Sequence, residues 1–135
     1  MNIFLSTSFS CKVNDQGEVL PDYKALVQER LQQLRAQGHT VFCVIEHRNW
    51  EILKSASKGD EVGFDVKKIR ESDTIVAICG QEISAGLQWE CGYMTGLGRP
   101  VYVWPENGQV TLSYWNQGLI DIGAMILIDS AVRVA

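Results

Sequence analysis

The sequence predicts an α/β fold in which a five-stranded parallel sheet lies between two layers of helices. Short runs of β-branched and apolar residues alternate with longer segments whose apolar residues recur at helical spacing, which is typical of repeated β-α-β units. Residues 74–79 form a continuous apolar run, as expected of a strand covered on both faces. The 135 residues, 46% of them hydrophobic, suffice for a single domain, 1–135, with its own core.

Each element can be placed from these patterns. We expect strands at residues 3–5, 40–45, 74–79, 101–104 and 124–128, and helices at residues 22–37, 60–72, 85–97 and 112–118. The first helix follows Pro21 and precedes Gly38, residues that suit the first turn and the C-terminal end of a helix. Right-handed crossovers then give a doubly wound three-layer sandwich of the flavodoxin-like or Rossmann-like type.

Ligands of such sheets bind beyond the carboxyl ends of the strands. Three predicted loops lie there, at residues 6–10, 81–90 and 105–113. The chain has no G-x-G-x-x-G pattern and no P-loop, so neither a dinucleotide nor a nucleoside triphosphate is expected, and no cofactor is implied.

Composition excludes several classes of partner. The net charge is −4 and the isoelectric point is about 5.1, which argues against binding to a nucleic acid polymer. No metal site is expected, because no C-x-x-C pair or zinc-like His spacing accompanies the four cysteines, which are predicted to be reduced thiols: Cys11, Cys43, Cys79 and Cys91. With no signal-like N-terminus and no apolar run long enough to span a membrane, a cytoplasmic location is expected.

Glu90 is the first candidate for chemistry. It falls on the apolar stripe of the third helix, with Leu87, Met94 and Leu97, and near the start of that helix, where the dipole favours an ionised carboxylate. A carboxylate on a core-facing stripe is costly unless it is paired or used. An ionised carboxylate at the mouth of a sheet suits covalent glycosyl chemistry. The alternative is a glutamate selected for the dipole alone.

Asp65 is the second candidate, because it borders the stripe that Val62 and Ile69 form in the preceding helix. A second carboxyl group near the first could protonate a leaving base. The alternative is a solvated residue beside Lys67 and Lys68. Among other residues, the segment 47–50 and the surroundings of Phe9 are expected to form walls that contact a base, and one of the four tryptophans could stack on it.

Taken together, three segments resemble the nucleoside 2-deoxyribosyltransferase superfamily, and within it the nucleoside 5′-monophosphate hydrolases. These are IFLSTS at 3–8, DVKKIRESD at 65–73 and SAGLQWECGY at 84–93, followed by GRPV at 98–101. The resemblance implies that Glu90 attacks the anomeric carbon to form a glycosyl-enzyme, with retention of configuration, and that Asp65 assists departure of the base. It also assigns substrate contacts to the first loop and the turn before Glu90, including Ser6, Phe9 and Gly86.

The resemblance also bears on the substrate. Transferases of the superfamily tend to carry Asp six residues before the nucleophile, where this chain has Ser84, and a serine can donate to a 5′-phosphate that a carboxylate would repel. The nucleotide hydrolases of the superfamily also have a serine in the first loop, which corresponds to Ser8 here. They have a further serine that a neighbouring subunit contributes to the site, which corresponds to Ser113. The resemblance therefore implies a nucleoside monophosphate as ligand and a homodimer, or higher homo-oligomer, with shared sites.

Two departures qualify these expectations. The superfamily often has Tyr where this chain has Phe4, and that hydroxyl is expected to bond the nucleophile near C2′, so Phe4 leaves room for a 2′-hydroxyl. The nucleotide hydrolases often have Arg where this chain has Ser10, near the phosphate. We therefore expect cleavage of the N-glycosidic bond of a ribo- or deoxyribonucleoside monophosphate. The alternatives are base exchange between deoxynucleosides and a non-catalytic nucleotide-sensing module; the base itself stays open.

Overall fold

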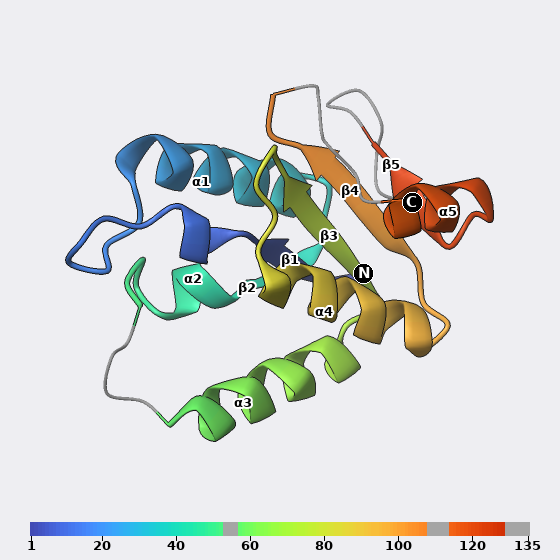
Figure 1. Cartoon of the computed structure of the whole chain (residues 1–135), viewed down its shortest axis with the longest axis horizontal. Helices are drawn as coiled ribbons and strands as arrows, with labels where there is room; N and C mark the ends of the chain where they lie inside the picture. Colours follow the sequence, from blue (N-terminus) through green and yellow to red (C-terminus); the bar gives the residue numbers. More distant parts are fainter. Residues whose placement is uncertain (53–56, 108–113, 129–135) are drawn as a thin grey trace.

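The protein is a five-stranded parallel sheet with helices on both faces, as a computed structural model shows for residues 1–52, 57–107 and 114–128 (Figure 1). The strand order is β2-β1-β3-β4-β5, and each pair of neighbouring strands is parallel. The strands are β1 (Asn2–Thr7), β2 (Thr40–Cys43), β3 (Thr74–Cys79), β4 (Val101–Pro105) and β5 (Met125–Leu127). This order is that of flavodoxin-like folds, which confirms the predicted fold class.

Two hydrophobic cores lie on the two faces of the sheet. One forms between the strands and α1 (Pro21–Ala36), and the other between the strands and α4 (Ala85–Gly96), with α3 (Lys58–Glu71) beside α4 on the same side (Figure 1). Alternate residues of β3 enter opposite cores, Val76 the first and Ala77 the second. All six residues of β3 are buried, as the continuous apolar run predicts.

Helix α1 begins and ends within one residue of the predicted range 22–37. Pro21 is its first residue, where the missing backbone N–H costs nothing. The chain leaves the helix through Gly38, whose φ of +88° is favourable for glycine. The side chains at helical spacing are buried against the sheet, namely Tyr23, Val27, Leu31 and Leu34.

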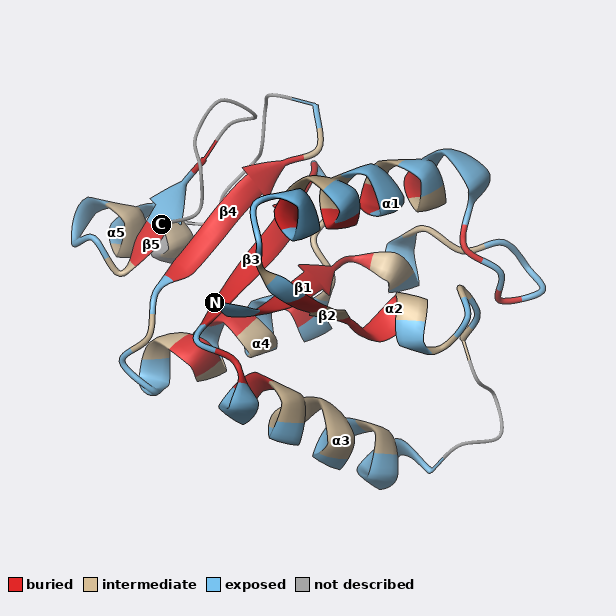
Figure 2. Ribbon diagram, turned by 180° about the vertical axis from the view of Figure 1, so that it is seen from behind, coloured by how far each residue is buried: buried red, intermediate tan, exposed pale blue. Residues whose placement is uncertain are grey.

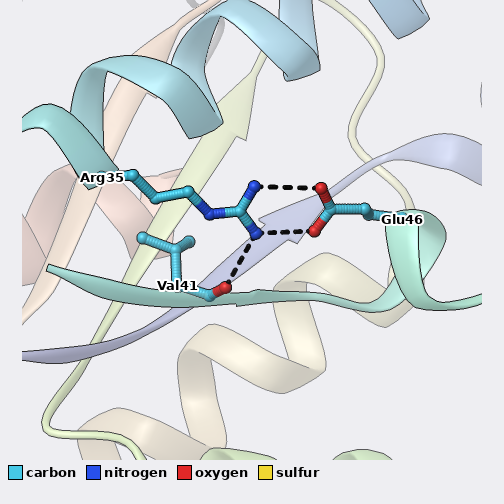
Figure 3. A network of polar contacts seen from close by, with 3 residues as sticks. All are labelled: Arg35, Val41 and Glu46. Carbon is cyan, nitrogen blue, oxygen red and sulfur yellow. Dashed lines mark hydrogen bonds and ion pairs between the residues drawn. The ribbon is translucent and has the colours of Figure 1, made fainter.

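The prediction of a strand over residues 40–45 was wrong at its end. β2 stops at Cys43, and the next four residues form the short helix α2 (Val44–His47). Val44 and Ile45 are β-branched and buried, so residue type alone favours a strand. The turn is held by a distant contact: the Arg35 guanidinium donates two hydrogen bonds to the Glu46 carboxylate, at 3.0 and 2.7 Å, and one to the Val41 carbonyl (Figure 3).

Helix α3 is packed more loosely than the sequence predicts. It spans Lys58–Glu71, against a predicted range of 60–72, and Ile69 is its one buried residue. Val62, expected on the core stripe, is 53% exposed, so that part of the prediction was wrong. Figure 2 shows the contrast between the exposed surface of α3 and the buried strands.

The remaining elements lie near their predicted positions. Helix α4 covers residues predicted as 85–97, but Leu97 is its C-cap and is 38% exposed rather than part of the core stripe. Helix α5 (Tyr114–Asp121) continues beyond the predicted 112–118, whose first two residues lie outside the described part of the chain. A short 3-10 helix, η1 (Phe9–Cys11), was not predicted. Within the described ranges, no helix has the length and apolar character needed to cross a membrane.

Candidate active site

A pocket of about 550 Å³ lies at the carboxyl ends of the strands, where the fold class places ligands. Its walls come from the loop after β1, the segment after α2, the first half of α3 and the start of α4. The lining residues are Thr7, Phe9, Ser10, Arg48, Glu61, Val62, Asp65, Ser84, Ala85, Gly86, Leu87, Trp89 and Glu90. Pockets of this volume hold small organic molecules, including nucleotides.

Glu90 lies on the face of α4 that turns toward the sheet, and it lines the pocket. It is the sixth residue of the helix, so it lies beyond the first turn, and the expected help from the helix dipole is correspondingly small. The Ser6 hydroxyl on β1 donates a hydrogen bond to its carboxylate. Burial raises the pKa of Glu90 from 4.5 to about 7, while that hydrogen bond opposes the rise. Glu90 is therefore a carboxylate whose ionisation changes near neutral pH.

Asp65 faces the same pocket from α3. One of its oxygens, Oδ2, lies 3.5 Å from Nη2 of Arg48, and its other oxygen, Oδ1, is buried without a hydrogen-bond partner in the described structure. Burial raises the pKa of Asp65, and the charge of Arg48 opposes that rise. An unpartnered buried oxygen is costly, so Oδ1 is the place where a proton or a ligand donor would be accommodated.

Arg48 is a pocket residue to which the sequence assigned no individual role. It follows α2, and its guanidinium lies 3.5 Å from Asp65 and 4.0 Å from Glu61. The next two residues, Asn49 and Trp50, have φ angles of 56° and 65°, in the left-handed region that asparagine adopts readily but that is unfavourable for a side chain as bulky as tryptophan. Arg48 is thus fixed between a helix and a strained turn, a placement that no periodic pattern could reveal.

The start of α4 forms the other end of the pocket. Ser84 caps the helix, its hydroxyl accepting the N–H of Leu87 at 3.2 Å. The Ser84 N–H in turn donates to the Ser8 hydroxyl at 3.1 Å. Ala85 and Gly86 line the pocket, and because they lie in the first turn their backbone N–H groups have no partner within the helix. The hydroxyl of Ser84 and the first turn of α4 therefore lie together at this end, and Ser8 supports them from behind the wall.

The structure brings most predicted site residues together. Glu90, Asp65, Phe9, Ser84 and Gly86 line the pocket, whereas Ser6 and Ser8 are buried behind its wall. Phe4 is fully buried and packs against Phe42, with ring centroids 5.8 Å apart. Ser113 lies outside the described residues.

The aromatic residues divide between core and pocket. Trp104 is buried, and Trp50 packs against the first core. Trp89, by contrast, is 48% exposed and lines the pocket. His47 stacks on Phe64 at 5.0 Å between centroids, and Arg48 is the residue of the segment 47–50 that lines the pocket. The expected wall is therefore formed by Phe9, Arg48 and Trp89.

The arrangement of charged groups points to one kind of chemistry. Three carboxylates, of Glu61, Asp65 and Glu90, share the pocket with one guanidinium, and within the described residues no group of three or more His, Cys, Asp or Glu could hold a metal ion. A negative site stabilises a cationic, oxocarbenium-like transition state, and two carboxyl groups can act as nucleophile and acid. The pocket therefore offers the groups that cleavage or exchange of a glycosidic bond requires.

The chain belongs to the nucleoside 2-deoxyribosyltransferase family, because the sequence profile of that family matches residues 17–125. The match covers most of the chain, including α3, β3 and α4 with both candidate carboxylates. The protein is accordingly an N-glycosidase or glycosyltransferase of this family. No curated protein matches the sequence at a significant level.

Three solved structures share the fold of this chain. The CMP N-glycosidase BcmB of Clostridium botulinum is 18% identical, with a TM-score of 0.67 over 98% of this chain and 91% of the other. BlsM, solved in solution, is 20% identical, with a TM-score of 0.69 over 97% and 81%. The 2-deoxyribosyltransferase of Bacillus psychrosaccharolyticus is 23% identical, with a TM-score of 0.62 over 87% and 90%.

Proposed function

We propose that the protein hydrolyses the N-glycosidic bond of a nucleoside 5′-monophosphate, with Glu90 as nucleophile and Asp65 as acid. The observation that carries this proposal is the Glu90 carboxylate, which is held from the sheet by Ser6 and faces a pocket of nucleotide size that a second carboxyl group shares. Such a pair of carboxyl groups is the working part of retaining glycosidases.

In the first step, the Glu90 oxygen that Ser6 does not hold attacks C1′. The bond from C1′ to the base nitrogen breaks, and its electron pair leaves with the base. Asp65 donates a proton to the base, for which its buried Oδ1 is suited because burial raises the pKa of this carboxyl group. The Oδ2 oxygen stays beside Arg48, whose positive charge stabilises the carboxylate that remains after proton transfer.

In the second step, water attacks C1′ from the face that the base has left. Asp65, now ionised, takes a proton from this water, a new C1′–O bond forms, and the ester bond to Glu90 breaks. Two displacements at the same carbon retain its configuration. The products are the free base and a pentose 5-phosphate, and both carboxyl groups return to their starting protonation states.

The phosphate is accommodated at the start of α4. The hydroxyl of Ser84 and the N–H groups of Ala85 and Gly86 supply donors, and the positive end of the helix dipole favours a dianion there. Ser8 holds the Ser84 backbone in place through its hydrogen bond. The resemblance adds Ser113 of a second subunit, so the proposal includes a homodimer with shared sites.

Base exchange between nucleosides is the second candidate, because the matching family profile is that of the nucleoside 2-deoxyribosyltransferases. The two functions share the glycosyl-enzyme and differ in the group that attacks it. Ser84 favours hydrolysis of a monophosphate, since transferases of the superfamily tend to carry an aspartate at the corresponding position, six residues before the nucleophile. BcmB, which shares the fold, is a CMP N-glycosidase, and this supports the same choice.

Release of free base from a panel of ribo- and deoxyribonucleoside 5′-monophosphates, beside the unphosphorylated nucleosides, tests the proposal. We expect release from monophosphates, abolished in Glu90→Gln and retained in Glu82→Gln, a matched change of an exposed glutamate outside the pocket. Release from nucleosides alone, or only when a second free base is added, would replace hydrolysis by base exchange. The ratio of the base-release rates for ribonucleotides and deoxyribonucleotides tests whether Phe4 leaves room for a 2′-hydroxyl.

A further inference from the structure

We infer that Ser6 is the positioning residue of the nucleophile: its hydroxyl holds one oxygen of the Glu90 carboxylate and leaves the other directed at C1′. The inference rests on the proposed function, because it concerns how that nucleophile is held. Residues of the first loop were expected to contact substrate, whereas Ser6 is 1% exposed and reaches the reaction through another side chain.

The hydroxyl comes from an inner strand of the sheet. Ser6 lies on β1, which pairs with β2 on one side and β3 on the other, and it is in register with Ala77 of β3. Backbone hydrogen bonds to neighbouring strands fix the position of such a residue closely. A donor on this strand therefore sets the orientation of Glu90, which is 84 residues away in the sequence.

Ser6 is the hydrogen-bond donor to Glu90 among the described residues. Phe4 lies two positions earlier on the same face of β1, but its ring packs in the second core and has no hydroxyl to offer. The next side chain on the strand, Thr7, points to the other face of the sheet by the same alternation. Position 6 is thus where the strand supplies a hydroxyl to α4.

The same bond acts in both chemical steps. While Glu90 attacks, the hydrogen bond favours its ionised form and prevents rotation of the carboxylate. In the glycosyl-enzyme, the oxygen that Ser6 holds is the carbonyl oxygen of the ester. When water displaces the ester, negative charge returns to that oxygen, and the hydroxyl proton stabilises it.

Several groups besides Ser6 influence the ionisation of Glu90. Asp65 on α3 faces it and raises its pKa, and Arg48 after α2 lowers it. Cys91 is its neighbour on α4 and is a buried thiol. A change at position 6 leaves all three in place, so its effect on Glu90 can be separated from theirs.

The test compares Ser6→Ala and Ser6→Thr with wild type in two ways. Carbon-13 NMR titration of the glutamate carboxyl groups, with Glu90 assigned by its absence in Glu90→Gln, reports the ionisation directly. We expect Ser6→Ala to raise the Glu90 midpoint by about one pH unit and Ser6→Thr to restore it. Repeating the titration with Asp65→Asn introduced into both wild type and Ser6→Ala removes the carboxyl group whose ionisation is coupled to that of Glu90.

Base release provides the second readout. In Ser6→Ala the acid limb of the pH profile moves up by the same amount, and kcat at pH 6 falls about tenfold with KM unchanged. Ser72→Ala is the matched control, because it also removes a buried serine hydroxyl, one that donates to the Lys68 carbonyl at the end of α3. This control should leave the Glu90 midpoint and the pH profile unchanged.

An unchanged Glu90 midpoint in Ser6→Ala overturns the inference, whatever the activity. A shifted midpoint with an unshifted acid limb overturns it as well, because Ser6 would then act on the charge but not on the reaction. If wild type releases no base from any nucleotide, the proposed function fails, while the NMR titration still decides whether Ser6 holds Glu90.

Discussion

The two helices that carry the carboxylates of the pocket are held in different ways. Helix α4 packs directly on the sheet through Leu87, Cys91 and Met94, and its Glu90 accepts a hydrogen bond from Ser6 of the inner strand β1. Helix α3 has Ile69 as its one buried residue, and its Asp65 forms an ion pair with Arg48 at 3.5 Å. Figure 1 shows α3 and α4 on the same side of the sheet.

The difference follows the demands of the two proposed roles. A nucleophile must be placed within a fraction of an ångström of C1′, so a rigid support at the sheet suits it. An acid must follow bases of different shape and release its proton, so a support that can adjust suits it. The anchoring of α2 by Arg35 and Glu46 then limits how far Arg48, and with it Asp65, can move.

Replacing Asp65 should separate the two roles most clearly. Asp65→Asn cannot donate a proton, so release of an ordinary base should fall about a hundredfold or more. A substrate whose base leaves without protonation, such as a 7-methylguanosine monophosphate, should lose far less. Single-turnover rates of base release for both substrates measure this. Equal losses for both would show that Asp65 does not act as the acid.

The stability of Glu90→Gln should depend on pH in a defined direction. The folded protein raises the pKa of Glu90 from 4.5 to about 7, so the folded state binds a proton more tightly than the unfolded state. The stabilising effect of that proton is complete below pH 4.5 and is lost as pH rises to about 7. Above that pH, the free energy of unfolding of Glu90→Gln should exceed that of wild type by up to about 3 kcal/mol.

Urea denaturation at pH 4.5 and pH 8 provides the measurement, with Glu82→Gln as control because that residue is exposed. The two proteins should be nearly equal in stability at the lower pH and differ at the higher one. If the two proteins differ in stability by the same amount at both pH values, ionisation of the Glu90 carboxyl group does not destabilise the fold, which would contradict the raised pKa.

Arg48→Met should loosen α3 and leave α4 unchanged. Without the guanidinium, Asp65 loses its partner and its pKa rises, and the ionised acid of the second step becomes less available. We expect turnover to fall about tenfold and amide hydrogen exchange to increase in α3 but not in α4. Lys67→Met, which removes an exposed ion pair at 3.9 Å on the same helix, is the control and should change neither. Equal exchange changes in both helices would remove the contrast between them.

Gly86→Ala should give the smallest effect and should act on α4 alone. A β-carbon there meets nothing nearer than the Ser84 hydroxyl at 3.9 Å, so the fold accepts it, and alanine favours a helix over glycine by about 0.5–1 kcal/mol. The added methyl group lies where the proposed phosphate approaches the helix. We expect an unchanged or higher Tm together with a severalfold higher KM for monophosphates. An unchanged KM would place the phosphate elsewhere.

Much of the fold could be predicted from the sequence because local patterns determine it. The apolar run 74–79 and the stripe of α1 each report burial directly, so β3 and α1 lie where expected. The end of β2 could not be predicted, since it depends on the pairing of Arg35 with Glu46 across eleven residues. The exposure of Val62 was also missed, because a stripe on a helix does not show whether a neighbour covers it.

The site was predictable in part for the same reason. Periodicity and resemblance singled out Glu90 and Asp65, and both line the pocket. Ser6 was recognised as a loop hydroxyl, but its bond to Glu90 depends on the meeting of β1 and α4, which only the folded chain shows. Arg48 lies in the segment 47–50 that was predicted as a pocket wall, but its pairing with Asp65 could not be predicted, because a single arginine after a short helix belongs to no pattern.

The measurement that tests the central claim most directly is mass spectrometry of the protein quenched during turnover of a nucleoside monophosphate. If Glu90 is the nucleophile, the peptide that contains it should gain the mass of the pentosyl phosphate, and Glu90→Gln should show no such adduct. Base release without an adduct on this peptide, or with an adduct on another residue, would contradict the account.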